Sequence, residues 1–220
     1  FVLYAIPNRD LGSHSAGGFD TDEEYFEFCR KIAKGIGNKS PVVIVEPDAL
    51  PHSTIQDLSD RKHRISLIKK AVKILANGCD AIIYIDIGHS DWLSTTDAYD
   101  LLMQSGISQA RGFSVNVSNY RTTEESLLWA SRIASGFEEE KFFILDTSRN
   151  GQGPLNDCWC NPPGRGLGEL PTNKTGSRFC DAYMWIKVPG ESDGKCNGGP
   201  NAGKFWPEQA VELVKNSPFI

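Results

Sequence analysis

The sequence lacks the features that define several large classes of protein. Its longest apolar runs, 1–6 and 81–85, are far too short to span a bilayer. Basic residues do not dominate anywhere: 23 Lys and Arg face 28 Asp and Glu, so the net charge is -5. This balance argues against nucleic acid and anionic membranes as partners. No Cys-x-x-Cys pair and no signal-peptide pattern are present, so we expect no zinc site and a mature or trimmed chain.

The cysteines that are present favour an oxidising compartment. The six cysteines form an even set, as expected of disulfides. Two acceptor triplets for glycosylation begin at Asn116 and Asn173. We therefore expect a secreted, extracellular protein.

Strand-like and helix-like segments alternate along the 220 residues. Apolar runs typical of buried strands cover 2–6, 42–46, 81–87, 112–117, 142–146 and 182–188. Amphipathic helical patterns cover 22–36, 60–76, 97–104, 124–135 and 207–215. This order predicts an α/β fold with a parallel sheet, open or closed into a barrel, in a single domain over 1–220. Only the stretch 150–181, rich in Gly, Pro and Asn, breaks the alternation and resembles a functional loop.

Every predicted strand ends in polar residues, whereas the opposite ends carry nothing similar. In chain order these residues are Asn8, Arg9, Asp10; Glu46, Asp48; Asp86, His89; Asn116, Asn119; Asp146, Arg149; and Lys187, Glu191, Asp193. The carboxyl ends of parallel strands meet at one rim, which is where α/β folds build their sites. We expect a single functional rim crowded with carboxylates.

Carboxylates beside aromatic rings suit the hydrolysis of a sugar polymer. Neighbouring carboxyls resist joint ionisation, so one can stay protonated while another stays charged. Trp92 and Trp159 follow the rim residues closely and offer faces for a pyranose ring. An acid that protonates the leaving oxygen and a base that activates water are the requirements of glycoside hydrolysis.

With these residues the chain resembles glycoside hydrolase family 6, the inverting cellulases. The matching segments are VLYAIPNRD at 2–10, VIVEPD at 43–48, YIDIGHSDW at 84–92, GFSVNVSNY at 112–120, DTSRNGQGP at 146–154, WCNPPGR at 159–165 and WIKVPGESDG at 185–194. They run in family order along most of the chain. The resemblance implies the distorted parallel (β/α) barrel of these cellulases and a β-1,4-glucan substrate, with no cofactor.

The resemblance also implies roles for the catalytic residues. Asp48 is the expected general acid, and Asp10 raises its pKa and joins the proton network around the water. Asp193 matches the carboxylate usually proposed as base. Asp86 is a supporting carboxylate, and Tyr4 presses on the distorted sugar.

Further residues are implied to bind substrate or to support the site. The clamp on the non-reducing side is expected to consist of Trp159, Lys187 and Glu191. The leaving-group side is expected to be lined by His89, Trp92 and Asn119. Arg9 and Arg149 are expected to pair with rim carboxylates, and Cys160 with Cys196 matches a family disulfide.

Three departures from the family pattern stand out. The family's first strand has no counterpart, so we expect a chain that is N-terminally incomplete relative to the family. The Ser that holds the catalytic water in many members falls at Ala16, so either neighbouring Ser15 takes its role or the activation of water is weakened. Leu11 replaces a family cysteine. For the other cysteines we expect the pairs Cys29–Cys79 and Cys158–Cys180.

The short segments after Asp10 and over 194–205 resemble the open-cleft endoglucanase form of the family. We also expect a monomer. Two alternatives remain open, an exo-acting cellobiohydrolase of the same family and a non-catalytic glucan-binding protein. A metal-dependent hydrolase using Asp48, Asp86 and His89 is a third, weaker hypothesis. His14, His52 and His63 are expected on the surface.

Overall fold

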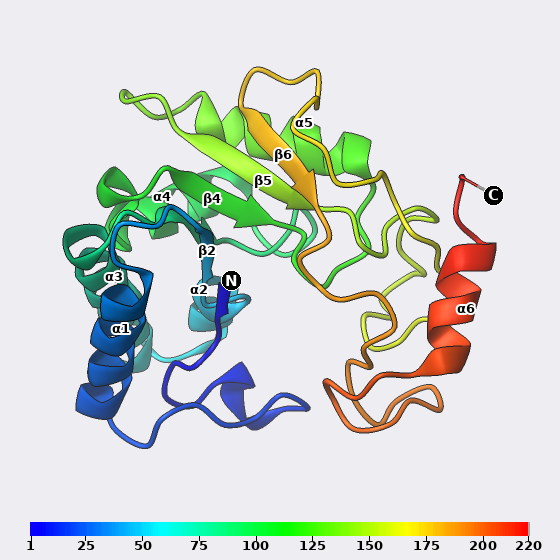
Figure 1. The fold of residues 1–220 in the computed structure, drawn as a ribbon, viewed down its shortest axis with the longest axis horizontal. Helices are drawn as coiled ribbons and strands as arrows, with labels where there is room; N and C mark the ends of the chain where they lie inside the picture. Colours follow the sequence, from blue (N-terminus) through cyan, green and yellow to red (C-terminus); the bar gives the residue numbers. More distant parts are fainter. Residues whose placement is uncertain (220) are drawn as a thin grey trace.

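The computed structural model describes residues 1–219, which form one six-stranded parallel sheet with helices (Figure 1). The strands are β1 (Val2–Leu3), β2 (Val42–Val45), β3 (Ile82–Asp86), β4 (Gly112–Val115), β5 (Phe142–Asp146) and β6 (Cys180–Met184). The helices are α1 (Asp22–Ile36), α2 (Ala49–His52), α3 (Leu58–Gly78), α4 (Thr95–Gln104), α5 (Thr123–Ala134) and α6 (Pro207–Lys215). The spatial order β1 to β6 follows the chain, and the sheet curls into a half-barrel.

Side-chain alternation along the strands separates two apolar layers. In β2, Val43 and Val45 pack with the helices in the main core, whereas Ile44 belongs to a small cluster on the other face. That cluster also contains Tyr84, Val117 and Ile144 and receives no helical residue. The helices therefore cover one face of the sheet, and the concave face is left for the barrel interior.

Local signals begin the helices that pack on the outer face. Thr21 and Glu24 form a reciprocal capping box at the start of α1. The Asp57 side chain accepts the Asp60 N–H and caps α3, so this helix begins two residues before the predicted 60–76. The longest helix pair, α1 and α3, packs side by side against the first strands (Figure 1).

The predicted fold class is confirmed, since six parallel strands form a curled half-barrel with helices. Several strands are shorter than predicted. The clearest case is β1, which ends at Leu3 instead of continuing to Ile6. Beyond Leu3 the side chain of Glu46 replaces the strand pairing, because it accepts the backbone N–H groups of Ala5 and Ile6.

One disulfide is confirmed and two predicted pairs are wrong. Cys160 and Cys196 are bonded, with their Cα atoms 6.1 Å apart. In residues 1–219 the other four cysteines are free thiols. The Cys79 thiol turns back onto the Leu75 carbonyl of its own helix, which removes it from Cys29. The thiols of Cys158 and Cys180 each lie against a carbonyl two residues along their own segment.

The two predicted glycosylation triplets differ in exposure. Asn116 is fully buried, and its amide donates to the carbonyls of Asp146 and Arg121. This side chain is closed to modification in the folded protein, whereas Asn173 is exposed. Over residues 1–219, no helix has both the length and the apolar character needed to cross a membrane.

Candidate active site

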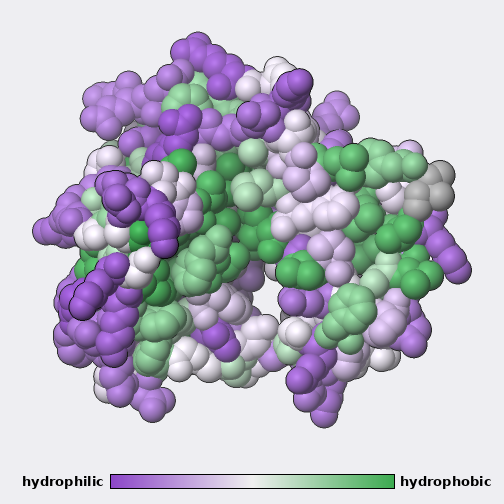
Figure 2. Space-filling view, in the orientation of Figure 1, coloured by the Kyte–Doolittle hydropathy of each residue, from purple (hydrophilic) through white to green (hydrophobic). Residues whose placement is uncertain are grey.

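A cavity of about 510 Å³ lies at the carboxyl ends of the strands, where the sequence predicts the rim. Ten predicted site residues line it: Tyr4, Asp10, Ser15, Asp48, His89, Trp92, Asn119, Trp159, Lys187 and Asp193. Six others do not line it: Arg9, Asp86, Arg149, Glu191 and the disulfide pair Cys160 and Cys196. Figure 2 shows the molecule hollowed near its centre, between the N-terminal part and the side that carries α6.

Three residues of the cavity wall have strained backbone. Asp10, Asp48 and Ser118 adopt positive φ angles of 57°, 66° and 60°, in a region that residues other than glycine seldom occupy. Asp48 and Ser118 lie shortly after the ends of β2 and β4, and Asp10 lies on the loop that follows β1. Such conformations persist only when surrounding contacts hold them, and they gather at functional sites.

Asp48 has the environment of a proton donor. Its Oδ1 atom is shielded from solvent and has no hydrogen-bond partner. Burial raises the pKa of the Asp48 carboxyl well above its usual range, and the charges of Asp86, Asp10 and Asp193 raise it further. The carboxyl is therefore kept protonated at a pH where an exposed aspartate is charged.

Asp86 supports Asp48 from behind the cavity wall. It is fully buried and accepts the backbone N–H of Asp48 at 2.9 Å, that of Gly88 at 3.1 Å and the Ser114 hydroxyl at 2.9 Å. Burial raises the pKa of Asp86, while these three donors stabilise its charged form. Because Asp48 Oδ1 has no such donor, the neutral form is favoured more strongly in Asp48 than in Asp86.

Asp10 and Ser15 lie together on the loop after β1. The Ser15 N–H donates to Asp10 Oδ2 at 2.7 Å, and Ser15, unlike Ala16, lines the cavity. The phenol of Tyr4 faces the same space, and burial raises its pKa, followed by the charges of Asp48 and Asp10. The loop thus presents the carboxylate of Asp10 and the hydroxyl of Ser15 to the cavity that Asp48 also lines.

The predicted pairing of Arg9 with a rim carboxylate is wrong. Its guanidinium donates instead to the carbonyls of Tyr4 at 2.7 Å, Ser15 at 2.8 Å and Ala16 at 3.1 Å. It also lies over the Tyr4 ring at 4.8 Å. The tight loop leaves these carbonyls without partners of their own, and Arg9 satisfies them.

Asp193 is held by many partners, and the predicted pairing with Arg149 is confirmed. Arg149 Nη1 contacts both carboxylate oxygens at 2.9 Å, and neither side chain is more than 9% exposed. Further donors are the Tyr120 hydroxyl at 3.2 Å and the Asn161 N–H at 3.0 Å. Lys187 Nζ lies 3.8 Å away. A carboxylate with so many donors is fixed in place.

Two tryptophans line the cavity in separate aromatic contacts. Trp159 is 55% exposed, and its indole contacts the His14 ring with centroids 5.8 Å apart. Trp92 packs against His89 and His52, with ring centroids 5.5 and 5.1 Å away. Burial lowers the pKa of His89 to about 4, so its imidazole is neutral and can accept or donate a hydrogen bond to a hydroxyl.

Lys187 and Glu191 form a loose pair at the end of β6. Their charged atoms are 3.9 Å apart, and only Lys187 lines the cavity. The backbone N–H of Lys187 donates to Asp146, which also accepts the Ser118 N–H; both contacts are 3.0 Å long. Asp146 therefore positions two wall segments rather than touching the cavity.

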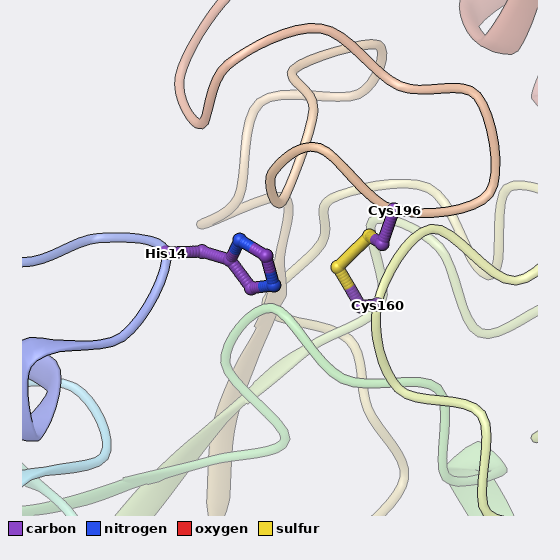
Figure 3. Close-up of side chains that lie close together, drawn as sticks. All are labelled: His14, Cys160 and Cys196. Atoms are coloured by element: carbon purple, nitrogen blue, oxygen red, sulfur yellow. A yellow bond between two sulfur atoms is a disulfide. The ribbon is translucent and has the colours of Figure 1, made fainter.

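His14 and the disulfide are close enough to resemble a metal site. The His14 nitrogen and the sulfurs of Cys160 and Cys196 lie within 4.8 Å of one another (Figure 3). Both sulfurs are used in the disulfide, so neither can act as a thiolate ligand. The contact instead brings the loop after β1 against the segment that carries Trp159.

Sequence reasoning missed several residues of the cavity wall. His14 and His52 were expected on the surface, yet both line the cavity, as do Ile55, Tyr120 and Arg121. A usable signal existed for His52, because it lies only four residues after Asp48, at the end of the short helix α2. Tyr120 ends one of the family-like segments and could have been included on that basis.

Comparison with known proteins identifies the family of the chain. The model of glycosyl hydrolases family 6 matches residues 1–217. Endoglucanase A of Cellulomonas fimi is 46% identical over 98% of this chain, and endoglucanase 1 of Streptomyces sp. (strain KSM-9) is 39% identical over 97%. The chain spans 46% and 59% of the lengths of these two relatives.

A solved structure agrees with this placement. The endoglucanase Cel6 from Mycobacterium tuberculosis, in complex with methyl-cellobiosyl-4-deoxy-4-thio-β-D-cellobioside, superposes with a TM-score of 0.93 and 44% identity. The match covers 98% of this chain and 74% of the solved one. The chain belongs to glycosyl hydrolases family 6.

Proposed function

We propose that this protein hydrolyses internal β-1,4-glucosidic bonds of cellulose or a related β-glucan with inversion at the anomeric carbon. The observation that carries the proposal is the carboxyl of Asp48, whose Oδ1 is buried without a partner beside a large cavity. Among the carboxyl oxygens of the described cavity wall, it is the one that is buried without a hydrogen-bond partner. The endoglucanase relatives support the same activity.

The chemistry follows from the positions of the carboxyls. Asp48 donates its proton to the glycosidic oxygen as the bond to the anomeric carbon breaks, and water attacks that carbon from the opposite face. Tyr4 beside Asp48 and Asp10 presses on the ring at the point of cleavage. The attacking water loses its proton to the network that contains Asp10 and Ser15, whose contact is 2.7 Å.

Asp193 is better suited to charge stabilisation than to direct proton abstraction. Arg149, Tyr120 and Asn161 already donate to its oxygens. In this proposal Asp193 balances the positive charge that develops on the sugar.

Sugar binding is assigned to both ends of the cavity. Trp159 and Lys187 hold the non-reducing side, where Glu191 pairs with Lys187, and an exposed indole gives a face for the ring's C–H bonds. The leaving-group side is lined by Trp92, His89 and Asn119. The solved Mycobacterium tuberculosis relative holds a cello-oligosaccharide analogue, in keeping with this substrate class.

The proposal includes endo rather than exo action by a secreted monomer that is one catalytic domain. Endo attack lowers the viscosity of a soluble cellulose derivative early, relative to the new reducing ends formed. Exo attack releases reducing ends with little early change in viscosity. Elution at about the mass of a single 24.3 kDa chain would support the monomer.

The test compares the protein with Asp48→Asn, which keeps shape but cannot donate the proton. We expect rapid loss of viscosity with the protein and none with the variant, while both bind cellohexaose. Binding without turnover by the unaltered protein would instead support the glucan-binding alternative.

A further inference from the structure

Glu46 is a buried carboxylate that the proposed chemistry leaves without a role. It follows β2 directly, two residues before Asp48, and is fully buried. Its φ angle of 51° is left-handed, and its N–H donates to the Leu3 carbonyl at 2.8 Å. Since β1 ends at Leu3, the Glu46 side chain stands where the pairing of β1 with β2 stops.

The carboxylate takes over that pairing. The Ala5 N–H lies 3.1 Å from both carboxylate oxygens, and the Ile6 N–H lies 3.2 Å from Oε2. Buried N–H groups need an acceptor, and β2 offers no further carbonyl to these two. The side chain of Glu46 therefore fixes the backbone of the chain just beyond β1.

That piece of backbone carries the catalytic side of the cavity. Ala5 directly follows Tyr4, and its carbonyl accepts the Phe19 N–H at 3.1 Å, which anchors the far end of the loop. The Tyr4 carbonyl accepts Arg9 Nη1 at 2.7 Å, at the near end. Fixing Ala5 thus fixes Tyr4 and both ends of the loop that presents Asp10.

The surroundings of Glu46 exclude contact with substrate. It does not line the cavity, and it is enclosed by Tyr25 and Cys29 of α1, with the charges of Arg9 and Arg64 nearby. Burial raises its pKa to about 7, and the Ala5 and Ile6 donors oppose that rise. Any effect of Glu46 on turnover must therefore pass through the backbone that it holds.

From these contacts we infer that Glu46 is a positioning residue, which holds Tyr4 and the Asp10 loop in the geometry needed for turnover. The inference rests on the proposed hydrolysis. Because a displacement of about 1 Å at reacting groups can reduce the rate about a hundredfold, a clamp so close to them controls kcat more than substrate affinity.

The test uses Glu46→Gln, which keeps one acceptor oxygen, and Glu46→Ala, which keeps none. The matched control is Asp181→Ala, which removes a carboxylate that accepts Arg111 and Tyr84 at the opposite end of the sheet. We expect kcat to fall about tenfold in Glu46→Gln and about a hundredfold in Glu46→Ala, with KM little changed. Asp181→Ala should lose thermal stability but keep kcat.

Hydrogen exchange of the Ala5 and Ile6 amides gives a second readout that does not depend on hydrolysis. Both Glu46 variants should lose protection at these amides, and the Asp181→Ala control should not. Wild-type kcat in Glu46→Gln, or unchanged protection of the two amides, would overturn the inference even if Glu46→Ala fails to fold. An inactive unaltered protein whose amides respond as predicted would count against the hydrolysis and not against the clamp.

Discussion

The disulfide and Asn161 make two separate connections between the same pair of loops. Breaking the disulfide should therefore lower stability while turnover is kept. The bond between Cys160 and Cys196 closes a loop with a sequence separation of 36 residues. The chain entropy of a loop of that size corresponds to about 4 kcal/mol of stability at 25 °C. We therefore expect reduction of this bond to lower the free energy of unfolding by about that amount.

Turnover should survive the same reduction, because Asn161 holds Asp193 independently. Its N–H donates to Asp193 Oδ2 at 3.0 Å, and its side-chain oxygen accepts the Asp193 N–H at 2.8 Å. Its amide nitrogen also donates to the Gly194 carbonyl at 2.8 Å. The expected result is a protein that unfolds more easily but has nearly unchanged kcat well below its unfolding temperature.

The assay is urea unfolding at 25 °C with and without a dithiol, beside initial rates on cellohexaose. The double variant Cys160→Ser/Cys196→Ser is the matched control, since its stability should not respond to the dithiol. A stability loss below about 1 kcal/mol would refute the loop-closure argument. A collapse of kcat on reduction in folded protein would refute the independent role of Asn161.

Three further predictions follow from the same contacts. Asp48→Asn should raise the unfolding temperature more at pH 8 than at pH 5. The pKa of Asp48 is raised in the folded protein, so this carboxyl costs stability increasingly as the pH rises above its unfolded-state pKa of about 3.9, and the Asn variant removes that cost. Equal gains at both pH values would contradict this. Trp159→Ala should raise KM for cellohexaose about fivefold, given roughly 1 kcal/mol per aromatic contact, with a smaller change in kcat; an unaltered KM would remove Trp159 from the binding surface. Arg149→Met should cost about 3–5 kcal/mol in urea unfolding by leaving Asp193 buried without its partner; Arg149→Met/Asp193→Leu should recover part of that loss, and no recovery would argue against the pair.

Much of the rim could be predicted because strand ends are visible in the sequence. Asp10, Asp48 and Asp193 each follow an apolar run, and parallel topology brings such positions together. The direction of a side chain is not visible in the same way. Asp48 points into the cavity, whereas Glu46 points behind the wall, although both are acids at the end of the same strand.

The misplaced contacts have a common physical origin in the irregular loops. Arg9 was matched to carboxylates by charge, but the tight turn at Asp10 exposes carbonyls that compete for its guanidinium. The partner of a thiol likewise depends on its rotamer, and Cys79 turns toward its own helix. His14 reaches the Trp159 segment only because the loop after β1 folds across, which no periodic pattern encodes.

The central claim is that Asp48 protonates the leaving oxygen while water attacks from the opposite face. Anomer-resolved hydrolysis of cellohexaose, followed in the first minutes by NMR for the protein and for Asp48→Asn, tests it most directly. The account predicts fresh α-anomer from the protein and none from the folded variant. Fresh β-anomer, or undiminished α-anomer from Asp48→Asn, would contradict it.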